Sequence, residues 1–211
     1  MGTLSVSSEL IRNTLWDLLL GVIPALLGWG LAAGVARTPR RLGWLWLPAG
    51  LVWLLFLPNA PYLLTEMRHY FRREPVMVWD DAGATRFLLI SGFYLAFSGS
   101  GLLLFALAVR PIHRLARERR WPVPFLAPAL FLLCSLGVYL GLRLRFNSWD
   151  LWKAPQEVLV SAWDALTVYR RAGPLIVGFA GVLWAAYVAV DIWIDGLLLR
   201  LGRRKTQGRK A

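Results

Sequence analysis

Three groups of polar side chains lie beside long apolar runs, and their residue types could bind or transform an anionic molecule at a membrane surface. Guanidinium groups can hold a phosphate through paired hydrogen bonds, carboxylates can hold a metal ion or move a proton, and amides and hydroxyls can orient a substrate. The groups comprise Asn59 and Tyr62; Asp80 and Asp81; and Arg143, Arg145, Asn147, Ser148 and Asp150. The elements around them must bring three distant parts of the chain together.

The candidate catalytic residues are the three carboxylates Asp80, Asp81 and Asp150. Adjacent carboxylates in a loop usually point apart, so a metal ion would need a third ligand such as Glu66, His69 or Asp150. The alternative is structural, because Asp80 and Asp81 can cap the helix that follows them, where the helix dipole favours negative charge. The sequence leaves the identity of a metal or another cofactor unknown.

The candidate substrate-binding residues come from the first and third groups. Residues two apart on a helix point to different sides, so one of the two arginines can face the bundle and hold a phosphate. In the structural alternative, both arginines contact lipid headgroups from the end of a span, and Asn59 caps the helix that follows it. The full set is Asn59, Tyr62, Arg143, Arg145, Asn147 and Ser148.

A proline-containing segment, Leu57-Pro58-Asn59-Ala60-Pro61-Tyr62, interrupts the apolar run 42–64. Proline removes a helical hydrogen bond and clashes with the preceding turn, and a backbone carbonyl freed in lipid has no water to bind. Such a break is tolerated where the backbone faces protein or a wet cavity. The segment therefore predicts an unwound stretch of the second helix beside a polar pocket. A re-entrant hairpin at this point would change the number of spans by one.

The composition indicates a membrane protein. The chain has 211 residues, of which 57% are hydrophobic and 12 are Trp. Apolar runs of ~20 residues match the thickness of a bilayer. We predict an all-α, polytopic transmembrane helical bundle in a single membrane domain, 1–211. Its five spans cover 18–36, 42–64 with a break at 58–61, 87–109, 123–142 and 174–197, and a basic tail follows at 200–211.

The net charge of +12 does not indicate nucleic-acid binding, because Lys and Arg gather at the ends of the apolar runs. Membrane lipids are the expected partners. Short connections rich in Lys and Arg usually stay in the cytoplasm. The connections 37–41 and 110–120, together with the tail, carry more of these residues than the opposite side does. We therefore predict an extracytoplasmic N-terminus and a cytoplasmic C-terminus.

Two short amphipathic helices are predicted in the long connections, which this orientation places on the extracytoplasmic side. At 100° per residue, apolar residues between 63 and 71 share one face, and those between 158 and 169 form a second. The first face contains Leu63, Leu64, Met67, Tyr70 and Phe71, and the second contains Val158, Leu159, Ala162, Trp163, Leu166 and Tyr169. Helices of this kind lie flat at the headgroup boundary or cover the end of a bundle.

Small and charged residues inside the spans have structural interpretations. Rows of small residues let helix backbones approach closely. Asp191 and Asp195 lie four residues apart on one face of the last span, where we expect them to pair with neighbouring arginines. His113 lies in the basic connection after the third span and is assigned no role. The small-residue rows are Gly30 with Gly34, and Gly92 with Ala96 and Ser100.

The segments FLPNAPY (56–62), WDD (79–81) and RFNSWD (145–150), in this order between apolar spans, resemble the bacterial integral-membrane family called domain of unknown function 1361. The resemblance covers nearly the whole chain, from the first span to the fifth. It implies a multi-pass protein of a bacterial plasma membrane, the inner membrane. It brings no established activity, so no catalytic role can be transferred to these residues.

Three classes of function fit the pattern. The first is an enzyme or binding protein for an anionic envelope or lipid substrate, and the second is a non-catalytic assembly or accessory protein. The third is a transporter subunit, which would need a homo-oligomer because five spans without repeats do not readily enclose a pathway. The sequence has no Walker loop, HExxH, CxxC or GxSxG motif, which disfavours classical ATPases, zincins and serine hydrolases.

Overall fold

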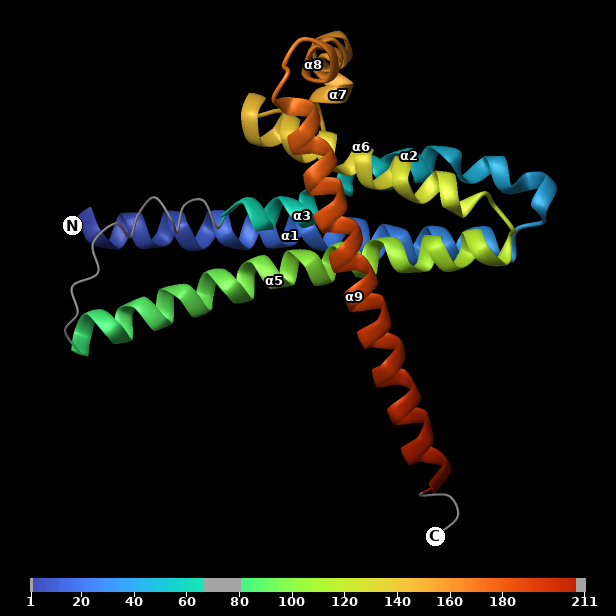
Figure 1. The fold of residues 1–211 in the computed structure, drawn as a ribbon, viewed down its shortest axis with the longest axis horizontal. Coiled ribbons are helices and arrows are strands. Elements are labelled where there is room, and N and C mark those ends of the chain that lie inside the picture. The colour runs from blue at the N-terminus through green and yellow to red at the C-terminus, as the bar shows by residue number, and fades with distance from the viewer. Residues whose placement is uncertain (1, 67–80, 208–211) are drawn as a thin grey trace.

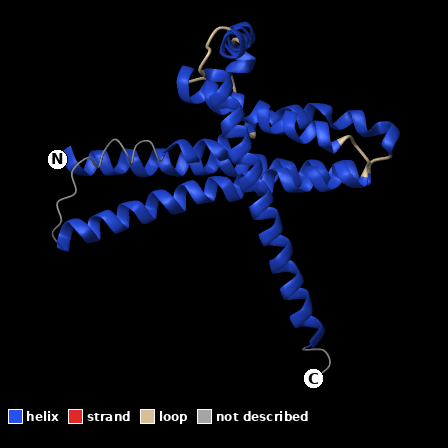
Figure 2. Cartoon of the chain, in the orientation of Figure 1, coloured by secondary structure: helices blue, strands red, loops and turns tan. Residues whose placement is uncertain are grey.

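A computed structural model describes the backbone of residues 2–66 and 81–207. These residues form helices joined by short turns, without a β-strand in either described range (Figure 2). The elements are α1 (Gly2–Arg37), η1 (Arg40–Trp46), α2 (Leu47–Phe56), α3 (Asn59–Tyr62), η2 (Leu63–Glu66), α5 (Asp81–Glu118), α6 (Val123–Leu144), α7 (Asp150–Lys153), α8 (Pro155–Thr167) and α9 (Ala172–Gln207). The predicted all-α class is confirmed.

Five helical segments are long and apolar enough to cross a membrane, as predicted. They cover Thr14–Arg37, Arg40–Thr65, Phe87–Glu118, Val123–Leu144 and Ala172–Leu201. The broken second helix counts as one span, so the described residues do not support a re-entrant hairpin. The main difference is in the third span, where α5 continues beyond the predicted end at 109 to Glu118. Arg, Ala, Leu and Glu in this extension are good helix formers, which accounts for its conformation.

The long helices do not form a parallel bundle. In Figure 1, α1 and α5 lie side by side and run in the same direction, and α2 and α3 pack along α1. In the same view α9 runs steeply across these helices, and it packs against α5 and α6. The helix α6 connects α9 to the group formed by α1, α2, α3 and α5, because it contacts the broken second span as well as α9. The core lies where these helices cross.

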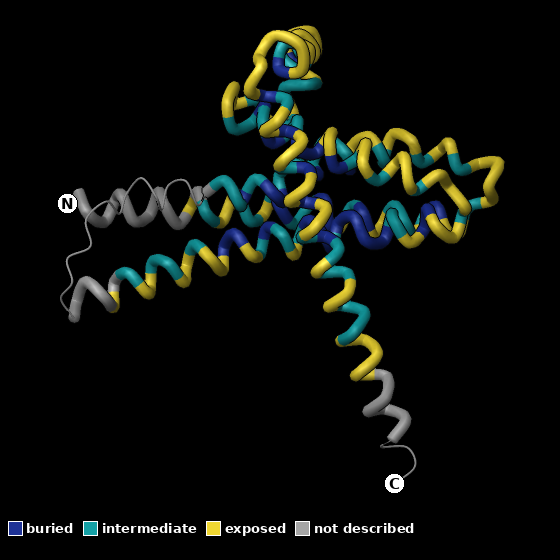
Figure 3. The backbone as a smooth tube through the Cα atoms, in the orientation of Figure 1, coloured by how far each residue is buried: buried dark blue, intermediate teal, exposed yellow. Residues whose placement is uncertain are grey.

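The core is a cluster of apolar side chains from α2, α5, α6 and α9. Leu57, Phe105, Cys134 and Leu183 are fully buried at its centre. The buried stretches gather near the crossing, and exposed residues cover the outer turns (Figure 3). Many of those exposed residues are large and apolar, including Phe125, which is 79% exposed. An apolar outer surface of this extent is typical of helices that face lipid.

Glycines allow close helix contacts, but not at all the positions that the sequence suggested. A Cβ atom added at Gly101 of α5 would lie 2.7 Å from the carbonyl oxygen of Ala60. One added at Gly28 would collide with the Ala108 carbonyl. Among the described residues, Gly30 and Gly92 have no atom within 4 Å of such a Cβ. The packing role predicted for these last two residues is therefore wrong.

One of the two amphipathic helices is described. The helix α8 covers Pro155–Thr167, where Val158 and Ala165 are buried against the protein. Leu159 and Trp163 on the predicted apolar face are 63% and 68% exposed. The other amphipathic helix was predicted over residues 63–71. Residues 63–66 form the 3-10 helix η2, and residues 67–71 lie outside the described residues. The position of both helices at the membrane surface stays a prediction.

Candidate functional site

The break in the second span is a kink and not an unwound segment. Leu57 and Pro58, between α2 and α3, keep right-handed helical backbone angles, with φ of −54° and −62°. The turn continues through hydrogen bonds from the Ala60 N–H to the Leu57 carbonyl (3.3 Å) and from the Tyr62 N–H to the Pro58 carbonyl (3.1 Å). The helix is interrupted between Phe56 and Asn59, but the predicted unwound stretch is wrong, because the backbone keeps helical angles and Leu57, Ala60 and Pro61 are buried.

Asn59 repairs the hydrogen bonding that the break disturbs. In a regular helix the Phe56 carbonyl would accept from the Ala60 N–H, which here binds Leu57 instead. The Asn59 Nδ2 group donates to the Phe56 carbonyl (3.0 Å) and to Ser148 Oγ (3.0 Å). The predicted cap is wrong, because a capping side chain accepts a backbone N–H bond, whereas Asn59 is the first helical residue and donates.

Two glycines of α6 bring the break next to the loop that carries Ser148. A Cβ atom at Gly137 would lie 2.6 Å from Pro58 Cγ, and one at Gly141 would lie 3.5 Å from the Tyr62 ring. Since neither position has a side chain, α3 can lie directly against α6. The structure therefore brings together Asn59, Tyr62 and Ser148, which belong to the first and third predicted groups.

The loop after α6 is shaped by its own residues. Arg145 ends the helix in the left-handed conformation, with φ of 60° and ψ of 27°. Asp150 Oδ2 accepts hydrogen bonds from the Asn147 backbone N–H (2.6 Å) and from Asn147 Nδ2 (3.4 Å). The carboxylate proposed as catalytic thus stabilises the turn that starts α7. Arg143 and Arg145 are exposed, and neither forms an ion pair with a described carboxylate.

In the second predicted group, the described residue Asp81 is not brought to this loop. Asp80 lies outside the described residues, and Asp81 is the first residue of α5, with a side chain that is also outside them. Gly101, which packs on Ala60, follows Asp81 along the same helix; at 1.5 Å per residue the two lie about 30 Å apart along its axis. Figure 1 shows this end of α5 far from α7.

The suggested metal site cannot be assembled from the described part of the chain. His69 and the side chain of Glu66 lie outside it, as do the side chains of both adjacent aspartates. Among the residues that the structure does describe, no group of three His, Cys, Asp or Glu side chains could hold a metal ion.

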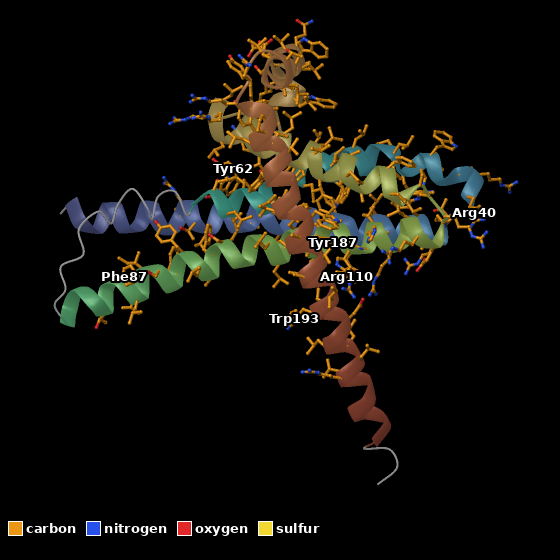
Figure 4. All side chains as sticks on the ribbon, viewed as in Figure 1. Arg40, Tyr62, Phe87, Arg110, Tyr187 and Trp193 are labelled. Carbon is orange, nitrogen blue, oxygen red and sulfur yellow. The ribbon has the colours of Figure 1, made fainter. Side chains whose placement is uncertain are left out.

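A second polar centre joins α5 to α9. Arg110, with a side chain that is 3% exposed, donates through one amino group to Asp191 Oδ1 (2.5 Å) and to the Asp191 carbonyl (2.9 Å). Its other amino group binds Asp195, which also pairs with Arg114 (2.5 Å). Figure 4 shows Arg110 on α5 beside α9. The predicted pairing of Asp191 and Asp195 with arginines is confirmed.

His113 lies one helical turn from Arg110 and was missed because residues 110–120 were assigned to a connection. Its Nδ1 atom lies 2.8 Å from the Tyr187 hydroxyl, and the two rings meet edge to face. The spacing of Arg110, His113, Arg114 and Arg117 is the signal that could have revealed it. Intervals of three and four residues place polar groups along one side of a helix.

A large apolar cavity lies beside this second centre. It has a volume of about 1290 Å³, is partly open to the surroundings and is lined by residues of α1, η1, α2, α5, α6 and α9. In the view of Figure 1, α2 and the start of α6 lie beside the C-terminal parts of α1 and α5, and α9 crosses at one end of this group. Both His113 and Tyr187 line it, together with Arg40, Arg117 and Arg119. The cavity is thus apolar, with a few polar groups on its wall.

Comparison with known proteins gives the family without an activity. No curated protein and no solved structure matches the chain. A model of the family described as "Protein of unknown function (DUF1361)" matches residues 16–186, which include all five spans at least in part, the broken second helix and the loop after α6. This protein therefore belongs to the DUF1361 family of unknown function.

Proposed function

We propose that this membrane protein binds an anionic envelope molecule, such as a phosphate-bearing lipid, at the loop that follows α6. The observation that carries the proposal is a pair of exposed arginines, Arg143 and Arg145, that form no ion pair with a described carboxylate. They flank the end of a membrane-spanning helix, where a lipid headgroup would lie. A guanidinium that has no carboxylate partner can bind phosphate through two parallel hydrogen bonds.

The loop is held in place well enough to select a ligand. Ser148 is fixed to the broken second span by Asn59, and Asn147 is fixed by Asp150. Trp152 beside the loop is 91% exposed, as expected of an aromatic ring at the level of lipid headgroups. A loop that is already ordered binds a ligand without the cost of ordering it at the moment of binding, and the guanidinium groups of Arg143 and Arg145 are its donors for an anion.

The proposal also covers the side of the membrane on which the loop lies and the catalytic role of the aspartates. The orientation with an extracytoplasmic N-terminus places this loop on the outer side of a bacterial plasma membrane. Asp80 and Asp81 keep their proposed roles in proton transfer or metal binding. The position of Asp81 at the start of α5 argues against its direct participation at the loop, and Asp80 lies outside the described residues. Binding, rather than catalysis, is therefore the function with the better geometric support.

Titration of the purified protein with short-chain phosphatidylglycerol and phosphatidylcholine tests the proposal. We expect preference for the anionic lipid, and a loss of affinity of about tenfold or more in the variant Arg143→Gln/Arg145→Gln. The matched control is Arg170→Gln/Arg171→Gln, which removes two exposed arginines before α9 and should change affinity little. Equal affinities in the two double variants would overturn the proposal.

An assembly or accessory role is the second candidate, and one observation favours it. Asn59 and Asp150 use their polar groups to stabilise neighbouring elements. If the loop only holds the bundle together, Asn59→Ala should lower abundance and cellular function in parallel. Arg143→Gln/Arg145→Gln should then leave abundance and cellular function unchanged.

A transporter subunit is the remaining class of function. A flux assay in proteoliposomes that detects no transport of ions or small solutes would argue against it.

A further inference from the structure

We propose that the cavity between η1, α2, α5, α6 and α9 binds one anionic phospholipid, with its acyl chains inside the cavity and its phosphate at Arg40 and Arg117. This site is separate from the loop after α6 and uses none of the same residues. It lies at the end of the molecule where α1 is followed by η1 and α5 by α6.

The size and chemistry of the cavity fit long hydrocarbon chains. Its volume of about 1290 Å³ is above the roughly 300–1,000 Å³ of sites for drug-sized molecules. The side chains that line it are mainly apolar and come from every surrounding helix. They include Leu31, Leu54, Ile112, Leu126, Phe131 and Val188. Apolar walls of this extent favour an apolar ligand over a polar metabolite, because a polar molecule would lose its hydration without compensation.

The charges at the cavity favour an anionic headgroup. Arg40, Arg117 and Arg119 line it, and none of the described lining residues is a carboxylate. Arg119 is already engaged, because its guanidinium donates to the carbonyls of Val35 (2.6 Å) and Thr38 (3.1 Å) at the end of α1. Arg40 and Arg117 are exposed and are left to bind a phosphate. Anionic lipids are attracted to such basic membrane-proximal sites.

A hydrogen-bonding group lies on the apolar wall. His113 and Tyr187 both line the cavity and bind each other at 2.8 Å, next to the buried Arg110. An ester carbonyl between the headgroup and the chains of a phospholipid needs a donor when it leaves water. The apolar region, the polar pair and the exposed arginines together match the three parts of one lipid molecule. That match selects a phospholipid over a peptide or a free fatty acid.

Native mass spectrometry of the full chain tests occupancy of the cavity. We expect one phosphatidylglycerol to stay bound to the Arg143→Gln/Arg145→Gln protein, which lacks the proposed loop site, after transfer from detergent micelles that contain this lipid. Gly50→Phe in the same background should abolish retention, because Gly50 lines the cavity and a Cβ there has Leu31, at 3.9 Å, as its one described neighbour within 4 Å. The matched control is Gly181→Phe on α9, where a Cβ has no described atom within 4 Å and the residue does not line the cavity. Equal retention in both variants would overturn the proposal.

The charge variants test the headgroup separately. Arg40→Gln/Arg117→Gln should reduce the preference for phosphatidylglycerol over phosphatidylcholine by roughly tenfold. The control Arg37→Gln/Arg41→Gln removes two exposed arginines that do not line the cavity and should keep the preference. Binding of phosphatidylcholine or detergent as strong as that of phosphatidylglycerol in the Arg143→Gln/Arg145→Gln protein would contradict an anionic site. All of these variants are made in the Arg143→Gln/Arg145→Gln background, so lipid bound at the loop after α6 cannot account for the result, and the test is independent of the proposed function.

Discussion

The two polar centres of this protein are built from different kinds of interaction. At the break in the second span, Asn59 makes hydrogen bonds between neutral groups, to Phe56 and Ser148. Between α5 and α9, the guanidinium of Arg110 binds the carboxylates of Asp191 and Asp195. Loss of a neutral bond leaves one polar group without a partner, whereas loss of a buried charge leaves its counter-ions uncompensated. The charged centre should therefore be the more sensitive of the two.

The largest effect is expected from Arg110→Ala. Breaking a buried ion pair by removing one partner is strongly destabilising. Asp191 and Asp195 are 27% and 48% exposed and can be hydrated, so we expect a loss of about 3 kcal/mol of unfolding free energy, the lower end of the range for buried pairs. Equilibrium unfolding in mixed micelles measures the loss. The control is Arg114→Ala, since the Arg114 side chain is 50% exposed and its ion pair should contribute far less. If the two variants lose the same stability, the charged centre has no special role in holding α5 against α9.

A close backbone contact at the break should give the next largest effect. Gly101→Ala places a Cβ atom 2.7 Å from the Ala60 carbonyl and 2.8 Å from Leu63 Cβ. Overpacking of this kind costs about 1–3 kcal/mol, and the upper value is expected because one clashing atom belongs to the backbone. Gly99→Ala on the same helix has no described neighbour within 4 Å and should be neutral or slightly stabilising. Equal stabilities would show that α5 moves away from α3 at little cost.

These contrasts explain which parts of the fold could be predicted. Apolar runs are encoded locally, so the five spans and the position of the break follow from the sequence. Helix contacts are not local: Gly101 and Gly30 look alike in the sequence, but only Gly101 has the backbone of another helix against it. The same limit applies to Asn59, whose partner Ser148 lies far along the chain.

The charged centre around Arg110 could be predicted only in part from the sequence, for a different reason. The pairing of Asp191 and Asp195 was predictable from their spacing, but the third span was predicted to end at 109 and the arginines that follow were assigned to a connection. The helix α5 instead continues through Pro111, and Arg110 is neutralised by two carboxylates from another helix. Arg110 can be buried because it pairs with Asp191 and Asp195 on α9. The sequence around Arg110 does not show these partners.

Removal of the Asn59 side chain tests the neutral centre. Asn59→Ala should cost about 2 kcal/mol, because it removes two hydrogen bonds and leaves the Phe56 carbonyl without its donor in the packed break. Asn147→Ala is the control of the same residue type, on an exposed loop where a lost bond can be replaced by water. The comparison of the two centres would fail if Asn59→Ala proved as costly as Arg110→Ala.

The smallest effect is expected from Tyr187→Phe, which removes a neutral bond next to the charged centre. The Tyr187 hydroxyl lies 2.8 Å from His113 Nδ1, and the ring itself is buried against Phe131. Because phenylalanine keeps the ring packing, the cost should be about 1 kcal/mol, the contribution of one hydrogen bond. Unfolding in the same micelles measures it. A loss close to that of Arg110→Ala would mean that the hydroxyl and the ion pairs act as one network, because independent neutral and charged interactions of this strength cannot give equal losses.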